Sequence, residues 1–298
     1  MSPSFPHTAV DSPWLVPFDG PFKVAKARTS PPKGTPDKKE RQRQLAELVS
    51  RLDELQRRLF ADDRWALLAV FQAMDAAGKD GTIRAVLSGV DPSGCQVSSF
   101  KAPSAEELDH DFLWRVTRKL PERGRIGVFN RSHYEEVLVV RVHPEYLDAQ
   151  RLPNRPQSVE ELFEQRLESI VDYERHLARN GMCVVKFWLN VSREEQRARF
   201  LQRLNEPEKN WKFNAGDVRE RGHWDAYMEA YQEALRATSK PWAPWYAIPA
   251  DSKSFARLEV AKILVETLER LDPHYPASPE DERARFAEMK ALLEAEAP

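Results

Sequence analysis

A turn rich in small residues carries the clearest chemistry in this sequence. It reads Ala73-Met74-Asp75-Ala76-Ala77-Gly78-Lys79-Asp80-Gly81-Thr82 and lies between an apolar run and a predicted helix at 83–87. A turn of small residues between a strand and a helix directs successive backbone N–H groups inward, and the helix N-terminus adds partial positive charge. Lys79 adds a mobile ammonium group. The segment from Ala76 to Thr82 therefore predicts a site for phosphate oxygens.

The turn departs from the standard pattern G-x-x-x-x-G-K-[ST] at two positions. Ala73 replaces the first glycine, and Asp80 stands where a serine or threonine would bind Mg²⁺. Thr82 comes two residues too late for that role. A tight structural turn is the alternative reading, but the position between a strand and a helix favours phosphate binding.

Asp75 is an unusual residue for such a turn, because a carboxylate next to a phosphate site repels the ligand unless a cation lies between them. The simplest resolution is Mg²⁺, with Mn²⁺ as a substitute, bridging Asp75 and phosphate oxygens. The alternative is that Asp75 caps the following helix, since aspartate is a favourable N-cap residue.

A second polar segment, Asn130-Arg131-Ser132-His133-Tyr134-Glu135, follows the apolar run 125–129. Chemistry in open α/β sheets collects at the carboxyl ends of strands, so Asn130 and Arg131 should face the turn at Gly78. The planar guanidinium of Arg131 suits a phosphoryl group in transfer. Asn130 keeps an acceptor oxygen but lacks the charge of the usual acidic residue, and Glu135 could orient a phosphate or a second metal ion. The alternative is a local Arg131–Glu135 ion pair on a helix.

Basic residues crowd the stretch 193–221, which also holds six acidic residues. Arg199 and Arg203 lie four residues apart and would share one face of a helix. Such a helix could close over phosphates as a lid, excluding water and neutralising charge. A solvated charged surface is the alternative.

Five short apolar runs alternate with helical patterns, which predicts an α/β fold with a mostly parallel sheet. The predicted strands are Arg64–Gln72, Cys95–Phe100, Arg125–Phe129, Cys183–Leu189 and Trp245–Ile248, and the predicted helices include Val159–Arg179, Arg193–Leu204, one from Asp37 and one after Ser252.

The composition narrows the functional class. The 298 residues include 45 Lys and Arg against 47 Asp and Glu, giving a net charge of −2, which argues against a globally basic nucleic-acid binder. Two cysteines cannot form a disulfide framework or a structural zinc site, and no apolar run reaches the ~20 residues of a membrane helix. We therefore expect a soluble cytoplasmic enzyme or binding protein, without nucleic-acid or membrane partners.

An ordered set of motifs resembles the polyphosphate kinase 2 family over about residues 40–272. The set comprises Met74–Thr82, Phe100-Lys101-Ala102-Pro103, His110-Asp111-Phe112-Leu113-Trp114-Arg115, Asn130–Glu135, Asn210-Trp211-Lys212-Phe213 and Ile248-Pro249-Ala250-Asp251-Ser252-Lys253. The resemblance implies a three-layer P-loop kinase fold, similar to thymidylate kinase, with a five-stranded sheet and a helical lid.

The resemblance also implies Mg²⁺-dependent transfer of a phosphoryl group from inorganic polyphosphate to AMP and ADP, giving ADP and ATP, with a reversible ADP/ATP step. It implies a homo-oligomer, a dimer or a tetramer. Transfer needs no covalent enzyme intermediate, because positioning and charge neutralisation supply most of the catalysis. An ATP-dependent nucleoside monophosphate kinase and a non-catalytic nucleotide- or polyphosphate-binding protein are the two alternatives.

The resemblance assigns roles to individual residues. Asp75 and Lys79 match the functional pair of the phosphate loop, with Asp75 as the metal ligand. Arg131 matches the arginine beside the second motif. Asn130 together with Glu135 is similar to the class III branch, which acts on both AMP and ADP. Arg199 and Arg203 correspond to lid arginines, with Arg199 expected to be catalytic, and Arg203 and Lys212 are expected to bind phosphate.

The expected domain organisation has three parts. Eight of the 22 prolines fall in residues 1–36, which predicts a proline-rich arm running over the surface. A P-loop kinase domain should span 37–272, with the lid at about 193–221. Residues 273–298 should form a C-terminal helical extension.

Overall fold

The structure, a computed structural model, describes residues 8–212 and 214–296, without the side chains of Lys209, Lys212, Asp281 and Ala284. Its five strands form one sheet in the order β2-β3-β1-β4-β5, and every neighbouring pair is parallel. The strands are β1 (Ala66–Gln72), β2 (Cys95–Ser99), β3 (Ile126–Asn130), β4 (Met182–Asn190) and β5 (Trp245–Pro249). All five predicted strands are confirmed.

The central strand β1 fixes where the polar segments meet. All seven of its residues are buried, because helices cover both faces of a parallel sheet, which explains its continuous apolar sequence. Phe71 pairs with Asn130 on β3, and Gln72 pairs with Trp188 on β4. The carboxyl ends of β1, β3 and β4 therefore lie at one edge of the sheet.

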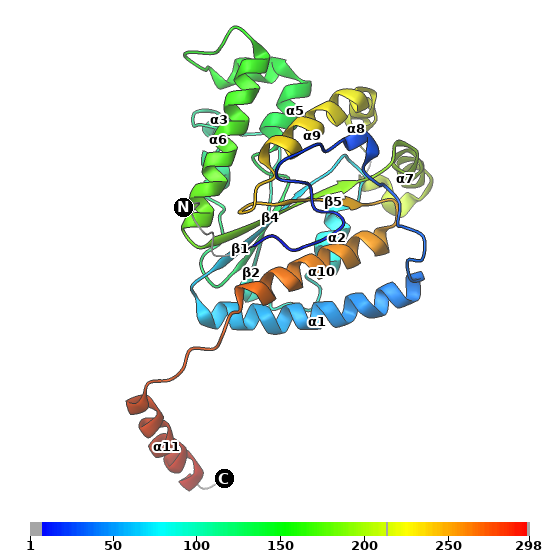
Figure 1. Cartoon of the computed structure of the whole chain (residues 1–298). Helices are drawn as coiled ribbons and strands as arrows, with labels where there is room; N and C mark the ends of the chain where they lie inside the picture. The colour runs from blue at the N-terminus through cyan, green and yellow to red at the C-terminus, as the bar shows by residue number, and fades with distance from the viewer. Residues whose placement is uncertain (1–7, 213, 297–298) are drawn as a thin grey trace.

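Helices cover the two faces of the sheet (Figure 1). On one side lie α1 (Lys38–Asp62), α2 (Lys79–Val86) and α10 (Lys253–Leu271), and on the other lie α5 (Glu135–Val142), α6 (Val159–Arg179) and α9 (Trp224–Thr238). Asp37 caps α1 by accepting a hydrogen bond from the Glu40 N–H at 2.9 Å, so the predicted helix start is confirmed.

The remaining helices complete the architecture. They are the α-helices α3 (Ala105–Leu108), α4 (Trp114–Thr117), α7 (Arg193–Asn205), α8 (Ala215–Glu220) and α11 (Glu280–Ala295), and the 3-10 helices η1 (Val24–Lys26), η2 (Pro92–Gly94), η3 (Pro144–Gln150), η4 (Pro207–Lys212) and η5 (Arg221–His223). Helix α11 lies apart from the sheet, beyond the end of α10 (Figure 1). Within the described ranges, no helix has the length and apolar character to cross a bilayer.

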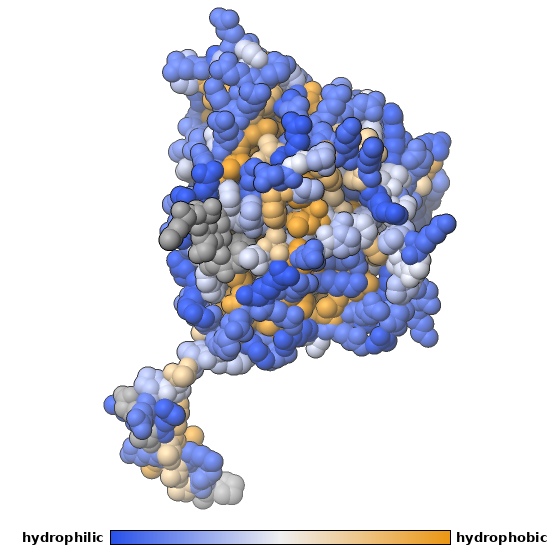
Figure 2. Space-filling model, in the orientation of Figure 1, coloured by the Kyte–Doolittle hydropathy of each residue, from blue (hydrophilic) through white to orange (hydrophobic). Residues whose placement is uncertain are grey.

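The N-terminal segment is more than a surface arm, so that expectation is wrong for its apolar residues. Val10, Trp14, Val16 and Val24 are buried. The Val16 N–H donates to the carbonyl of Trp245 in β5. The segment therefore covers the outer edge of β5 and satisfies part of its backbone, which an edge strand otherwise exposes. Figure 2 shows apolar residues over the middle of this face, ringed by hydrophilic ones.

Candidate active site

The phosphate turn itself forms the start of α2. The helix begins at Lys79, four residues before the predicted start, with Gly78 as its N-cap. Gly78 has a φ of 105°, a conformation that favours glycine, and Ala76 has a φ of 61°. No side chain caps this helix end, so the first amides of α2 keep their donors available to a ligand. The alternative that Asp75 caps the helix is wrong.

A cavity of about 670 Å³ opens at this turn. Its lining includes every residue from Met74 to Gly81, together with Asn130 and Arg131 after β3. Three lining side chains are acidic (Asp75, Asp80 and Asp217) and eight are basic (Lys79, Arg84, Lys101, Arg131, Arg199, Arg203, Lys253 and Arg257). This excess of positive charge suits a ligand with several phosphate groups.

Thr82 does not belong to the cavity lining, although it was expected to bind phosphate. Thr82 is buried, and its backbone N–H donates to the carbonyl of Gly78 at 2.9 Å. This hydrogen bond stabilises the first turn of α2. The prediction failed because α2 begins at Lys79, so that Thr82 lies within the helix and not in the turn.

Arg131 joins the two polar segments. Its Nη2 donates to Oδ1 of Asp75 at 2.9 Å, and its Nη1 donates to Oε2 of Glu135 at 3.0 Å. The two carboxylates, Glu135 more strongly than Asp75, raise the pKa of Arg131. Its φ of 63° is uncommon for a residue with a side chain, and such strain often marks a functional site. The expected position of Arg131 at the phosphate turn is confirmed, and the Arg131–Glu135 ion pair, which was the alternative reading, is also present.

Lys79 is half-buried beside this cluster. Its Nζ donates to the carbonyl of Ala73 at 2.8 Å. Burial lowers the pKa of Lys79, and the positive charge of Arg131 lowers it further. On the other side of the turn, Asn130 Nδ2 donates to Oδ1 of Asp80 at 2.6 Å. Lys79 and Arg131 are therefore two neighbouring cations that are partly shielded from water. An anion bound between them would stabilise both charges.

Arg199, an expected lid residue, has a different environment from the expected one. Its side chain is buried, and all five of its N–H groups donate to protein acceptors: the carboxylate of Glu195 and the carbonyls of Ala76, Ala77, Ala250 and Asp251. A guanidinium has five N–H donors in total. In this conformation Arg199 therefore ties α7 to the phosphate turn and leaves no donor for a phosphate.

The other residues expected in the lid differ from Arg199. Arg203 lines the cavity and lies 3.5 Å from Oδ2 of Asp217. Asp217 and Asp75 both line the cavity. Burial raises the pKa of Asp217, and the negative charge of Asp75 raises it further. The side chain of Lys212, an expected phosphate ligand, lies outside the described part of the chain.

The donor set fits a divalent cation that takes most of its ligands from a substrate. The described residues contain no group of three or more His, Cys, Asp or Glu side chains that could hold a metal ion alone. Mg²⁺, however, is usually bound by one or two carboxylates together with phosphates and water. Three carboxylates line the cavity, those of Asp75, Asp80 and Asp217, and the side chain of Asp75 is partly exposed at the turn.

Five charged residues of the cavity lining were not among the predicted site residues: Arg84, Lys101, Asp217, Lys253 and Arg257. A signal existed for two of them, because Lys101 and Lys253 follow the second and fifth predicted strands, at the edge where the other site residues gather. Arg257 lies four residues after Lys253 and thus on the same helix face.

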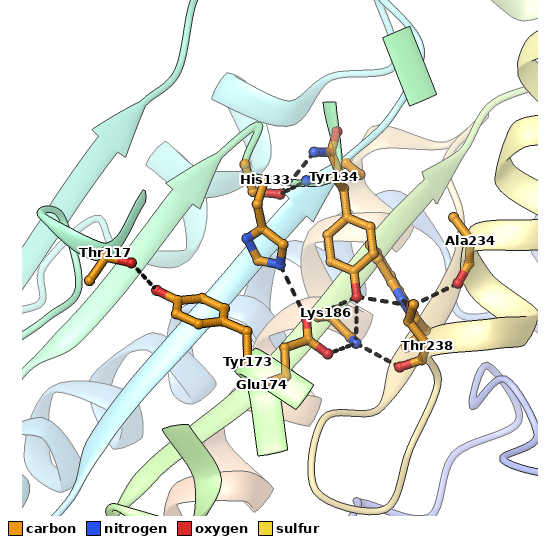
Figure 3. Close-up of polar contacts among 11 residues, drawn as sticks. Thr117, His133, Tyr134, Tyr173, Glu174, Lys186, Ala234 and Thr238 are labelled. Atoms are coloured by element: carbon orange, nitrogen blue, oxygen red, sulfur yellow. Dashed lines mark hydrogen bonds and ion pairs between the residues drawn. The ribbon is translucent and has the colours of Figure 1, made fainter. Parts of the chain in front are cut away.

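A buried polar network supports the segment that carries Arg131 and Glu135. Figure 3 shows His133, Tyr134, Glu174 and Lys186 pointing toward one another. Lys186 Nζ donates to Oε2 of Glu174 at 2.5 Å, to the Tyr134 hydroxyl at 2.8 Å and to the Thr238 carbonyl at 2.8 Å. Because Tyr134 directly precedes Glu135, this network holds the start of α5 against β4.

The same segment is tied to the end of β1. Gln72 Nε2 donates to the Ser132 hydroxyl at 3.0 Å, and the Tyr134 N–H donates to the same hydroxyl. Gln72 and Ser132 are both buried. The contacts of Ser132 with Gln72 and of Tyr134 with Lys186 therefore hold the strained backbone at Arg131 in place. A site that positions charged groups requires such rigid support.

Comparison with known proteins gives one consistent result. The sequence model of a family described as Polyphosphate kinase 2 matches residues 35–276. An ADP-polyphosphate phosphotransferase of Rhodopseudomonas palustris is 56% identical over 245 residues, which are 82% of this chain and 85% of that protein. An AMP/ADP-polyphosphate phosphotransferase of Meiothermus ruber is 48% identical over 232 residues, 78% of this chain and 82% of that protein.

A solved structure shows the same architecture. The crystal structure of polyphosphate kinase 2 from Arthrobacter aurescens TC1 superposes with a TM-score of 0.83 at 38% sequence identity. The match covers 94% of this chain and 99% of that chain. The expected fold, an α/β P-loop kinase architecture with a five-stranded parallel sheet, is confirmed.

Proposed function

The chain belongs to the polyphosphate kinase 2 family, and from that premise we propose that it transfers the terminal phosphoryl group of inorganic polyphosphate to AMP and to ADP. The products are ADP and ATP. The observation that carries this proposal is the cavity at the phosphate turn, where eight basic side chains face three acidic ones. A polyphosphate end and a nucleotide bring two polyanions together, and only a strongly basic site can offset their repulsion.

The residues of the turn bind and orient the reacting phosphates. Backbone amides between Ala76 and Gly81 and the ammonium of Lys79 hold phosphate oxygens, except for the N–H of Ala77, which donates to the Met74 carbonyl. Arg131, fixed between Asp75 and Glu135, donates to the oxygens of the phosphoryl group in transfer. Arg203 reaches the same cavity from the lid. Orientation and charge neutralisation are sufficient for such a transfer, so no covalent enzyme intermediate forms.

Asp75 is the residue we assign to a divalent cation, Mg²⁺ with Mn²⁺ as a substitute. When bound, the cation neutralises part of the charge of the two phosphate groups that meet at the turn. Asp75 keeps Arg131 in place through its Oδ1. Arg199 is a positioning residue in this proposal, because its bonds to Ala76 and Ala77 shape the turn.

Further assignments follow from the family resemblance. Asn130 with Glu135 supports the class III assignment, in which both AMP and ADP are acceptors. We propose that residues 193–221 form the lid of a kinase domain spanning 37–272, flanked by the segments 1–36 and 273–298. The enzyme is proposed to be a homo-oligomer and to act in the cytoplasm, where adenine nucleotides are available.

The phosphoryl donor is the property that distinguishes this function from that of an ordinary nucleoside monophosphate kinase. With AMP, polyphosphate and Mg²⁺ but no ATP, the purified protein is expected to form ADP first and ATP later, as a chromatographic time course of the nucleotides would show. The matched reaction replaces polyphosphate with ATP. Product formation only in that matched reaction would contradict the proposal, and binding without transfer in either reaction would indicate a non-catalytic protein.

A further inference from the structure

Helix α7 holds the phosphate turn by its carbonyl groups. Nε2 of Gln196 donates to the carbonyl of Asp75 at 3.0 Å. Nη1 of Arg199 donates to the carbonyls of Ala76 at 3.0 Å and Ala77 at 2.7 Å. Gln196 and Arg199 are both buried. Three consecutive carbonyls of the turn are therefore bound to side chains of one helix.

These hydrogen bonds set the direction of amide donors in the turn. A trans peptide unit is planar, so its C=O and its N–H point in opposite directions. Each of the three bound carbonyls shares its peptide unit with the N–H of the following residue. Helix α7 therefore fixes the N–H groups of Ala76, Ala77 and Gly78. The N–H of Ala77 donates to the Met74 carbonyl at 3.2 Å within the turn, and α7 aims the other two.

The start of α7 is held by Asp251, which lies in the loop after β5. Oδ1 of Asp251 accepts from the N–H of Ser192, the N-cap residue of α7, at 2.7 Å. Nη2 of Arg199 donates to the carbonyl of Asp251 at 3.0 Å and to that of Ala250 at 2.7 Å. Asp251 therefore ties the carboxyl end of β5 both to the start of α7 and to the guanidinium that holds the turn.

The N-terminal segment fixes Asp251 itself. The Ser30 hydroxyl donates to Oδ2 of Asp251 at 2.8 Å, and the Asp251 N–H donates to the carbonyl of Thr29 at 2.9 Å. Both carboxylate oxygens, the N–H and the carbonyl of Asp251 are thus hydrogen-bonded to other segments. Thr29 and Ser30 precede residues 35–276, which the family model matches, so this support comes from a part of the chain that the model does not cover.

We propose that Asp251 is a positioning residue for phosphoryl transfer, which aims the amides of the phosphate turn by anchoring α7. Among the described residues, Asp251 is not part of the lining of the active-site cavity, so it acts through Ser192 and Arg199. Donors that are oriented before the reaction stabilise the charge that develops in the transition state. The inference rests on the proposed function, because that function assigns these amides to the reacting phosphates.

The test compares two substitutions of the same residue. Asp251→Ala removes both carboxylate contacts and should lower kcat by roughly tenfold or more, because small misplacements of catalytic groups have large effects on rate. The KM for AMP should change by less than about threefold, since the loss falls mainly on the transition state. In Asp251→Asn, Oδ1 still accepts from Ser192 and the amide can donate to the Ser30 hydroxyl, so kcat should stay within about threefold of the unmodified value.

Gln232→Ala is the matched control for the loss of hydrogen bonds around the N-terminal segment. Gln232 of α9 accepts from the Val24 N–H at 2.8 Å and donates to the Phe22 carbonyl at 2.6 Å. Its replacement should lower the midpoint of thermal unfolding and leave kcat unchanged. A similar fall of kcat in Gln232→Ala and Asp251→Ala, or a lower midpoint with unchanged kcat in Asp251→Ala, would overturn the positioning role.

Adding Arg199→Lys tests the path through α7. Lysine keeps the charge but lacks the planar fork that reaches the carbonyls of the turn and of the loop. The fall in kcat of the double variant with Asp251→Ala should be clearly smaller than the product of the two single falls, because both changes release the same helix. Independent effects would overturn this path. If the unmodified enzyme phosphorylates AMP only from ATP, the proposed function fails, and the same kcat ratios measured with ATP decide the role of Asp251.

Discussion

Replacing Lys79 with Met is expected to lower kcat for polyphosphate-dependent ATP formation by about three orders of magnitude. The substitution keeps the length of the side chain and removes its charge at the point where the turn meets the reacting phosphates. A cation in a partly dry site stabilises developing charge far more than one in water, so its loss falls mainly on the transition state. Initial rates with AMP and saturating polyphosphate give the measurement.

Two variants control for this result. Lys39→Met removes the charge of an exposed lysine on α1 and should leave kcat unchanged. Lys79→Arg keeps the charge but alters its geometry, so its activity should fall between those of the unmodified enzyme and the Met variant. A Lys79→Met enzyme with nearly full activity would remove Lys79 from the mechanism.

The pH dependence of Lys79 follows from the direction of its pKa. Burial and the charge of Arg131 lower this pKa, so the ammonium loses its proton at a lower pH than an ordinary lysine. Activity should therefore decline as the pH rises through this lowered pKa, at a lower pH than an ordinary lysine would give. In Lys79→Arg this alkaline decline should move to higher pH, because arginine stays protonated.

Breaking the buried Lys186–Glu174 pair is expected to destabilise the fold by about 3–5 kcal/mol. Both side chains are almost fully buried from solvent, and Lys186 also contacts Tyr134 in the segment that carries Arg131. Glu174→Gln leaves a buried ammonium without its counter-ion, and Lys186→Met leaves a buried carboxylate. Urea unfolding of each variant gives the free energy of unfolding.

The double variant separates the pairing of the charges from simple loss of packing. In Lys186→Met with Glu174→Gln neither charge remains, so the combined loss should be clearly smaller than the sum of the two single losses. Additive losses would contradict a coupled pair. The kcat of the single variants should also fall, because Tyr134 links Lys186 to the segment that holds Glu135.

The protonation states of the pair support this expectation. Burial lowers the pKa of Lys186 to about 8, although Glu174 opposes the shift, so the lysine is charged at neutral pH. Burial alone would raise the pKa of Glu174, but its interactions with Lys186 and His133 together outweigh the effect of burial, and the net shift of the pKa is downward. The stability that the Glu174 carboxylate contributes is therefore present at neutral pH and is lost as the pH falls through its lowered pKa.

The sheet and the centre of the site could be predicted because they depend on local patterns. Continuous apolar runs identify strands that are covered on both faces, and β1 has no polar residue before Gln72. The carboxyl ends of parallel strands lie at one edge, so Asp75 and Arg131 had to meet once the strand order placed β3 beside β1.

Other parts of the site depend on contacts between distant segments, which spacing does not reveal. Arg199 lies in a charged run typical of a solvated surface, yet its partners are carbonyls of the phosphate turn and of the loop after β5. Lys186 is charged but lies within an apolar strand, since its partner Glu174 comes from α6. The cavity position of Arg257 likewise depends on how α10 packs beside α2.

Direct transfer between the two bound polyanions is tested best by following the phosphorus atoms themselves. Time-resolved phosphorus NMR of the enzyme with AMP, polyphosphate and Mg²⁺ is expected to show a phosphorus signal of ADP and then the γ-phosphate of ATP. These signals should grow as phosphate units are lost from the polyphosphate chain, without accumulation of free phosphate. Loss of polyphosphate to free phosphate with AMP unchanged, or spectra that do not change at all, would contradict a shared site at Lys79.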